Sequence, residues 1–282
     1  MSPDRGDGSW TAFRLAYDGR GYHGFQRQPD VPTIEGALLT AFHDLEITPD
    51  PTAVPPGYAA ASRTDAGVSA AAQTIAFRAP EWLTPAALNG RLPDRIRVWD
   101  PQPVEATFDP RRDAIRRRYS YLIDPSGMDI DRARVVCRAV EGVHDFYNLT
   151  SDTEHTIREI YRVTLDECNE FLRLTVTADG FLRQQVRRLA TLVEAVGRDR
   201  RPLTDVDRVL AEKPLPGRTG IAPADPTGLL LDHVEYEDVT FDPPADDVVA
   251  PFRAEAKQLR KVGAIMDDIA TARESYLESG SD

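Results

Sequence analysis

The chain has 282 residues, of which 41% are hydrophobic, and its formal net charge at pH 7 is −12. No window approaches the roughly 18 consecutive apolar residues of a membrane-spanning helix, and the polar opening residues do not resemble a signal sequence, so we expect a cytoplasmic protein of one large or two modest domains. The two cysteines, Cys137 and Cys168, and the five histidines show no metal-ligand spacing, so we expect ordinary reduced side chains and no metal site.

Arginine dominates the basic residues, because only three of the 34 are lysines. An excess of carboxylates with little lysine suits a chain that must stay hydrated in concentrated salt, where charge repulsion is screened. We therefore expect a halophilic host. An arginine-rich genome would explain the missing lysines but not the net charge.

The predicted elements follow an α+β pattern after a polar, disordered segment of residues 1–9. A strand over residues 10–17 leads into a glycine-rich turn, and Thr33 can cap a helix over residues 33–45. Further strands and two short helices are expected, the sheet being mostly antiparallel. These strands cover residues 68–77, 96–104, 114–123, 161–166, 171–177 and 229–236, and the helices cover residues 85–91 and 130–140.

A longer helix is expected over residues 181–196, where the apolar residues recur at helical spacing. Its buried stripe would be Leu182, Val186, Leu189, Val193 and Val196. This helix would place Arg183 and Arg187 together on an adjoining face. The stretch FDPPADD, residues 241–247, reads as a linker, and residues 251–277 as a C-terminal helix in the most acidic part of the chain.

Two arginine clusters stand out against the acidic background. Their guanidinium groups suit phosphate oxygens, which they can bind bidentately, although a hydrated surface with ion pairs is an alternative explanation. The first cluster is Arg111, Arg112, Arg116, Arg117 and Arg118, and the second is Arg183, Arg187, Arg188, Arg198, Arg200 and Arg201.

The segment SRTDAGVSA, residues 62–70, places Asp65 among small residues in a turn-like stretch, where its carboxylate can be exposed. A lone aspartate of this kind is commonly a turn former. Here, however, the segment resembles the G-R-T-D-A-G-V-H-A signature of the TruA family of tRNA pseudouridine synthases, with Ser62 and Ser69 in place of the usual glycine and histidine. Four more blocks resemble that family in the same order over residues 10–238. They are YDGRGYHGFQRQ, ATFDPRRDAIRRRYSYLI, GFLRQQVRRL (with Gln185 where methionine is usual) and APADPTGLLLDHVEY.

The resemblance implies an α+β fold of two similar halves, residues 10–110 with the catalytic Asp loop and residues 111–240. Their joined, mostly antiparallel sheets would be flanked by helices around a central RNA-binding cleft. The acidic linker and helix of residues 241–282 have no counterpart that we recognise. The resemblance also implies a homodimer that acts on tRNA without metal or cofactor and converts uridine to pseudouridine in the anticodon stem-loop, typically at positions thirty-eight to forty.

The reaction breaks the C1′–N1 bond, turns the base and bonds C1′ to C5, so the base must first leave the stack. Asp65 would be the nucleophile, or the base in glycal formation, and Arg187 the fixed cation that keeps its carboxylate charged. Arg63 would fill the vacated place or hold a phosphate. Tyr119 would stack on the uracil with its hydroxyl near the C5 proton, whereas Tyr121 reads as a core residue. The other expected substrate-binding residues are Gln26, Thr64, Arg111, Arg116 and Arg118, together with Leu229 and Leu230, which core packing explains equally well.

Two alternatives stay open. A catalytically inert RNA-binding or RNA-remodelling protein could use the same cleft without needing Asp65, and a synthase of this type could act on another uridine or RNA. A hydrolase with an aspartate nucleophile fits less well, because the sequence places no second carboxylate or histidine to activate water.

Overall fold

The computed structural model describes residues 8–211, 214–215 and 220–279, with side chains described up to residue 271. The chain divides into two compact units, with the boundary between Asp242 and Pro243. None of the helices in these ranges is both long enough and apolar enough to cross a membrane.

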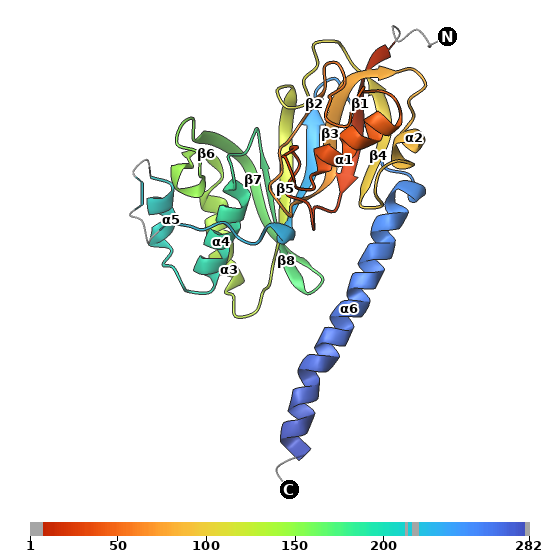
Figure 1. The fold of residues 1–282 in the computed structure, drawn as a ribbon. Helices are drawn as coiled ribbons and strands as arrows, with labels where there is room; N and C mark the ends of the chain where they lie inside the picture. The colour runs from red at the N-terminus through yellow and green to blue at the C-terminus, as the bar shows by residue number, and fades with distance from the viewer. Residues whose placement is uncertain (1–7, 212–213, 216–219, 280–282) are drawn as a thin grey trace, which may run out of the picture. The chain divides into compact units, whose positions relative to one another are not determined.

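The first unit is built on a single sheet in the order β4-β1-β3-β9-β5-β8-β7-β6, with β2 beside β3 (Figure 1). Every pairing is antiparallel except that of β3 with β9, which is parallel and joins Ser69 to Leu230 and Ala70 to Leu231. The last strand in sequence therefore lies in the middle of the sheet. The strands are β1 (Gly8–Tyr17), β2 (Ala59–Ala60), β3 (Ser69–Pro80), β4 (Ile96–Pro103), β5 (Ala114–Ile123), β6 (Gly142–Asp145), β7 (Ile157–Cys168), β8 (Phe171–Ala178) and β9 (Leu229–Tyr236).

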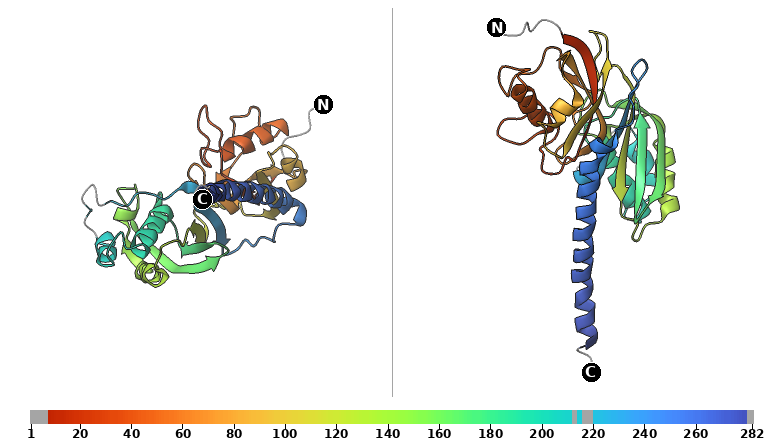
Figure 2. Two further views of the ribbon diagram at one scale, coloured as in Figure 1. Left: turned by 90° about the horizontal axis from the view of Figure 1, so that it is seen from below. Right: turned by 90° about the vertical axis from the view of Figure 1, so that its right-hand side faces the viewer.

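The helices of this unit cover the two ends of the sheet separately (Figure 2). α1 and α2 accompany the β1, β3 and β4 end, while α3 and α4 pack against each other and against β7 and β5. Aromatic contacts fix α1 on the sheet, since the ring centroid of Phe77 lies 5.5 Å from that of Phe13 and 4.9 Å from that of Phe42. The helical elements are α1 (Ile34–Asp44), α2 (Pro85–Asn89), α3 (Ile130–Ala139), α4 (Gln185–Gly197), α5 (Thr204–Val209) and the 3₁₀ turns η1 (Tyr147–Leu149) and η3 (Pro226–Gly228).

The mixed α+β class and the mostly antiparallel sheet flanked by helices are confirmed. Thr33 caps α1 as predicted, with its hydroxyl oxygen accepting from the Gly36 amide at 3.1 Å. The short elements β2, β6, η1 and α5 were not predicted, and residues 1–7 lie outside the described ranges.

The predicted start of the helix over residues 181–196 is wrong, because α4 begins at Gln185. Gln184 has a φ of 61°, which ends the preceding loop, and the Gln185 side-chain oxygen accepts from the Leu182 amide at 2.8 Å. Arg183 therefore lies on a loop, not on the helix face shared with Arg187. The predicted buried stripe is nevertheless buried throughout.

The second unit contains α6 (Asp246–Ser279), which begins five residues before the predicted start at Pro251. The helix accommodates Pro251 in its second turn, where the missing N–H removes one hydrogen bond. The predicted linker is also shorter than expected. Phe241 lies 4.2 Å under the Arg14 guanidinium, and the Asp242 amide donates to Asp100, so both residues belong to the first unit.

Candidate active site

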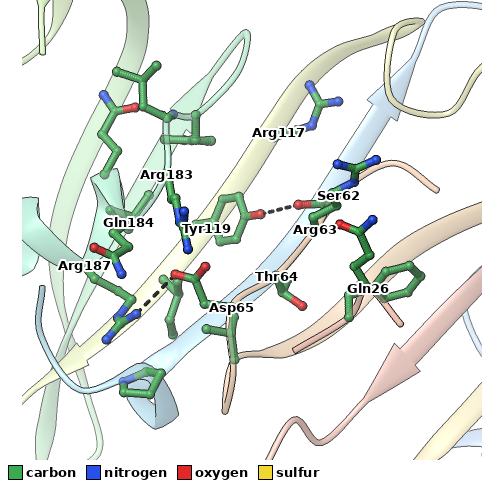
Figure 3. A pocket seen from close by; sticks show the side chains of 18 of the residues that line it. Gln26, Ser62, Arg63, Thr64, Asp65, Arg117, Tyr119, Arg183, Gln184 and Arg187 are labelled. Atoms are coloured by element: carbon green, nitrogen blue, oxygen red, sulfur yellow. Dashed lines mark hydrogen bonds and ion pairs between the residues drawn. The ribbon is translucent and has the colours of Figure 1, made fainter. Parts of the chain in front are cut away.

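A pocket of about 1060 Å³ lies in the first unit, and all five sequence blocks contribute to its lining. Gln26 comes from the first block, Asp65 from the second, Tyr119 from the third, Arg187 from the fourth and Leu229 from the fifth. The blocks are thus spread over the sequence but meet around one space, which Figure 3 shows from close by.

The glycine-rich turn of the first block supports the loop that carries Asp65. The Phe25 amide donates to the Thr64 carbonyl at 3.0 Å, and the Gly67 amide donates to the Tyr22 carbonyl at 3.1 Å. Gly24 has a φ of 93°, and a Cβ there would lie 2.8 Å from the Thr64 oxygen. A side chain at this glycine would therefore push the Asp65 loop away.

Asp65 forms the expected ion pair with Arg187 from α4. The distance between Arg187 Nη1 and Asp65 Oδ2 is 3.2 Å (Figure 3), and the two side chains are 10% and 30% exposed, respectively. Arg187 Nε also donates to the Ala224 carbonyl at 2.7 Å, which holds the guanidinium in place. The carboxylate consequently faces the pocket beside a cation that is fixed from a second side.

Tyr119 lies in the same pocket, with its side chain buried. Its hydroxyl is 2.8 Å from the hydroxyl of Ser62, and its ring meets that of Phe181 edge-on at 5.1 Å. Burial raises the pKa of the Tyr119 phenol above its ordinary value, so the phenol is neutral at neutral pH.

Ser62 is itself held by Gln73, whose side-chain amide accepts from the Ser62 N–H at 3.0 Å and donates to the Ser62 carbonyl at 2.7 Å. Sequence analysis noted Ser62 only as a departure from the usual glycine. The other departure, Ser69, accepts from the Gly19 amide at 3.0 Å and so ties the first block to the start of β3.

The lining is strongly basic although the whole chain is acidic. Arg117, which was not in the expected set, donates to the carbonyls of Ala61, Arg111 and Asp179, and burial lowers its pKa. The lining includes six arginines, Arg63, Arg111, Arg117, Arg158, Arg183 and Arg187. Such a lining suits a ligand that carries several phosphates.

Arg116, Arg118 and Leu230 do not line the pocket, because successive residues of a strand face opposite sides of the sheet. Arg117 and Tyr119 face the pocket, so the residues between and beside them on β5 face away. Arg116 instead lies 3.3 Å from Glu235, and Arg118 pairs with Asp232 at 2.5 Å. Their proposed contacts with RNA stay predictions that the pocket itself does not support.

The pocket also holds a second carboxylate, Asp152, which sequence analysis did not expect. Its Oδ2 accepts from the Arg183 amide at 3.0 Å, so this carboxylate orders the loop before α4. Arg183 is directed into the same space in Figure 3. Among the described residues, no group of three histidine, cysteine, aspartate or glutamate side chains could hold a metal ion.

Comparison with known proteins supports the family resemblance that the five sequence blocks carry. The family model described as "tRNA pseudouridine synthase" matches residues 136–237. Relatives named tRNA pseudouridine synthase A share 47% identity over 232 residues in Halobacterium salinarum, 48% over 233 in Natronomonas pharaonis and 42% over 237 in Methanopyrus kandleri. Each alignment covers 82% of this chain, together with 86%, 86% and 88% of the relative, respectively.

These relatives define the class as pseudouridine synthases, which are isomerases. The chain belongs to the tRNA pseudouridine synthase A (TruA) family, so the predicted family and enzyme class are confirmed. A crystal structure of an archaeal box H/ACA sRNP complex matches with a TM-score of 0.33 and 13% identity over 65% of this chain and 44% of that chain, too remote a likeness to support a conclusion.

Proposed function

We propose that this pocket isomerises uridine to pseudouridine in tRNA, at positions thirty-eight to forty of the anticodon stem-loop, without metal or cofactor. The observation that carries the proposal is the Asp65–Arg187 ion pair, at 3.2 Å, in a pocket to which all five family blocks contribute. Family membership supports the reaction type. The arginine lining supports a substrate with several phosphate groups, such as the backbone of tRNA.

The chemistry needs only groups that this pocket contains. Asp65 either attacks the sugar as a nucleophile or removes a sugar proton to form a glycal, and N1 leaves with the electrons of the C1′–N1 bond. After the base turns, C5 bonds to C1′ as the bond between Asp65 and the sugar breaks or, in the glycal route, as the removed proton returns to the sugar. The net change moves one proton from C5 to N1, so no oxidant, reductant or second substrate is consumed.

Arg187 supports this chemistry because its positive charge lies beside the Asp65 carboxylate, where both side chains are largely shielded from water. Tyr119, a neutral phenol, offers a flat ring against which uracil can stack and a hydroxyl that can hydrogen-bond to the base. The edge-on contact with Phe181 and the Ser62 hydroxyl keep that ring and its hydroxyl in one position.

The target base is paired or stacked in tRNA and must be extruded before it can enter such a pocket. Arg63 lies on the Asp65 loop and lines the pocket, where its guanidinium can take the place of the base or bind the adjacent phosphate. The remaining pocket arginines would bind the flanking backbone, and Leu229 would form the apolar wall against the base.

We also propose the remaining features that the family resemblance implies. The two similar halves are residues 10–110 and 111–240, which are joined through β3 and β9 with the RNA cleft between them. The protein would act in the cytoplasm as a homodimer.

A base-resolved pseudouridine map of tRNA from cells with and without the gene tests the proposal. The expected result is loss of pseudouridine at positions thirty-eight to forty, restored by the wild-type gene and not by Asp65→Asn. Loss at other uridines would overturn the assigned positions. An unchanged map, together with tRNA binding by the purified protein, would instead identify a non-catalytic RNA-binding protein.

A further inference from the structure

A buried glutamine on β3, Gln73, holds the first residue of the segment that carries Asp65. Its side chain is 0% exposed, so it cannot touch a substrate. Its carboxamide oxygen accepts from the amides of Ser62 and Thr74 at 3.0 Å and 3.1 Å, and its carboxamide nitrogen donates to the Ser62 carbonyl at 2.7 Å. Most of the hydrogen bonding of this side chain is therefore directed at one residue, Ser62.

These hydrogen bonds lie where the chain turns away from β3 toward the pocket. Ala61 still bonds to β3 through its main chain, since its amide donates to the Thr74 carbonyl at 2.9 Å. At Ser62 the partner is the Gln73 side chain instead. A carboxamide carries an acceptor oxygen and an N–H donor in one plane, as a peptide group does, so it can satisfy both main-chain groups of one residue. The chain can thus leave β3 without leaving these groups unpaired.

Ser62 is connected to both chemical groups of the pocket. Its hydroxyl lies 2.8 Å from the Tyr119 hydroxyl (Figure 3), and Asp65 follows three residues later in the chain. Thr64, just before Asp65, is anchored separately, because its hydroxyl lies 2.7 Å from the hydroxyl of the buried Tyr17. A shift of Ser62 would therefore change the position of the phenol hydroxyl relative to the carboxylate.

We propose that Gln73 is a positioning residue for the isomerisation, a role that rests on the proposed function. Through Ser62 it holds the Tyr119 hydroxyl and the start of the Asp65 loop in the arrangement that the reaction needs. Because Gln73 does not contact the substrate, its loss should lower kcat and leave KM nearly unchanged. A misplacement of about 1 Å in such an arrangement can cost about 100-fold in rate.

The substitution Gln73→Glu distinguishes positioning from simple core packing, because glutamate has nearly the same shape as glutamine. A protonated carboxyl can accept from the Ser62 amide and donate to the Ser62 carbonyl, as the carboxamide does. An ionised carboxyl cannot donate, and it sets a negative oxygen against that carbonyl. Burial and the carbonyl both favour the protonated form, so the pKa of the introduced carboxyl should lie above its ordinary value. The variant should therefore work at low pH and fail as the pH rises.

The native groups around Gln73 do not produce this pH dependence. Burial raises the pKa of Tyr17 on β1 and of Tyr119 on β5, so both phenols stay neutral below about pH 9. The neighbouring charged groups are Asp65 and Arg117, whose guanidinium donates to the Ala61 carbonyl at 3.2 Å. All four are also present in the wild-type protein, so the ratio of variant to wild-type kcat isolates the introduced carboxyl.

Tritium release from an unmodified tRNA transcript carrying 5-tritiated uridine measures kcat and KM of the full-length chains. Between about pH 6 and about pH 9, the kcat ratio of Gln73→Glu to wild type should fall about tenfold, with KM within about twofold. Gln73→Met, which can make none of these hydrogen bonds, should lose about 10- to 100-fold in kcat at every pH. Gln258→Glu adds the same carboxylate at an exposed position of α6 and should match wild type throughout.

Circular dichroism at the assay temperature measures how much of each variant is folded. A folded Gln73→Glu variant whose kcat ratio does not change with pH, or which loses activity through KM, would overturn the positioning role. Unfolding in parallel with the loss of turnover would overturn it too, because Gln73 would then only support the fold. If Gln73→Met does not fold, Gln73→Glu at low and high pH still decides. A wild-type protein that forms no pseudouridine would overturn the proposed function itself and this role with it.

Discussion

Replacing Asp65 by asparagine separates catalysis from folding and from binding. At 3.2 Å and an effective dielectric constant of about 20, the attraction between the Asp65 and Arg187 charges is about 5 kcal/mol. Because the Asp65 side chain is 30% exposed, water replaces much of this attraction, and the amide oxygen can still accept a hydrogen bond from Arg187. We therefore expect a net stability loss of about 1–2 kcal/mol, or about 2–8 °C in Tm.

The catalytic loss should be much larger. An amide cannot serve as nucleophile or base, so turnover should fall below about 1% of wild type, which is a barrier increase of at least about 2.7 kcal/mol. The tRNA Kd should change less than about threefold, or about 0.7 kcal/mol, since the substitution removes a negative charge from a basic pocket.

Tritium release from an unmodified tRNA transcript carrying 5-tritiated uridine measures the turnover, and filter binding measures the Kd. Asp152→Asn is the matched control, because it makes the same substitution at the other pocket carboxylate, and it should keep more than about a tenth of the activity. Turnover of Asp65→Asn above about 1%, or a parallel tenfold loss of tRNA binding, would refute the assigned role.

Four further outcomes follow from the same geometry. Arg187→Met should be nearly inactive while thermal unfolding shows a folded protein, and Arg187→Lys should recover part of the turnover; a fully active Arg187→Met would remove the ion pair from the mechanism. Ser62→Gly should lower kcat about 2- to 10-fold with KM unchanged, because it removes one hydrogen bond from the Tyr119 hydroxyl, and Ser62→Thr should restore the rate. Arg117→Gln should weaken tRNA binding and flatten its salt dependence more than Arg118→Gln, which lies outside the pocket; equal effects would show that RNA also contacts the other side of the sheet. Turnover and circular dichroism should both be highest in molar salt, and a protein that is folded and most active at about 0.1 M salt would refute the halophilic interpretation.

The parts of the fold that local patterns determine were predictable from the sequence. The bounds of β5 and β9 were predicted from the sequence pattern, and the start of α1 was predicted from the capping residue Thr33. The start of α4 was not predictable, because it depends on the positive φ of Gln184 and on a side-chain hydrogen bond from Gln185, neither of which affects apolar periodicity.

The site was predicted best where the family blocks supplied the residue and least well where only charge did. Arg116 and Arg118 were chosen from a charge cluster, yet strand alternation places Arg117 on the same face as Tyr119, so the signal for Arg117 was available. Arg158 and Asp152 had no comparable signal, because only the tertiary fold brings β7 and the loop before it to the pocket.

The central position of β9 has a consequence for how the protein is made. Residues 229–236 leave the ribosome after every other strand, yet they lie between β3 and β5. Until they are synthesised, the strands form two separate groups, each with an unpaired edge where β9 will insert, and Asp65 and Arg187, 122 residues apart, have no sheet to join them. A nascent chain shorter than this therefore lacks the joined sheet that brings the two residues together, and its open edges make it prone to strand pairing with other chains.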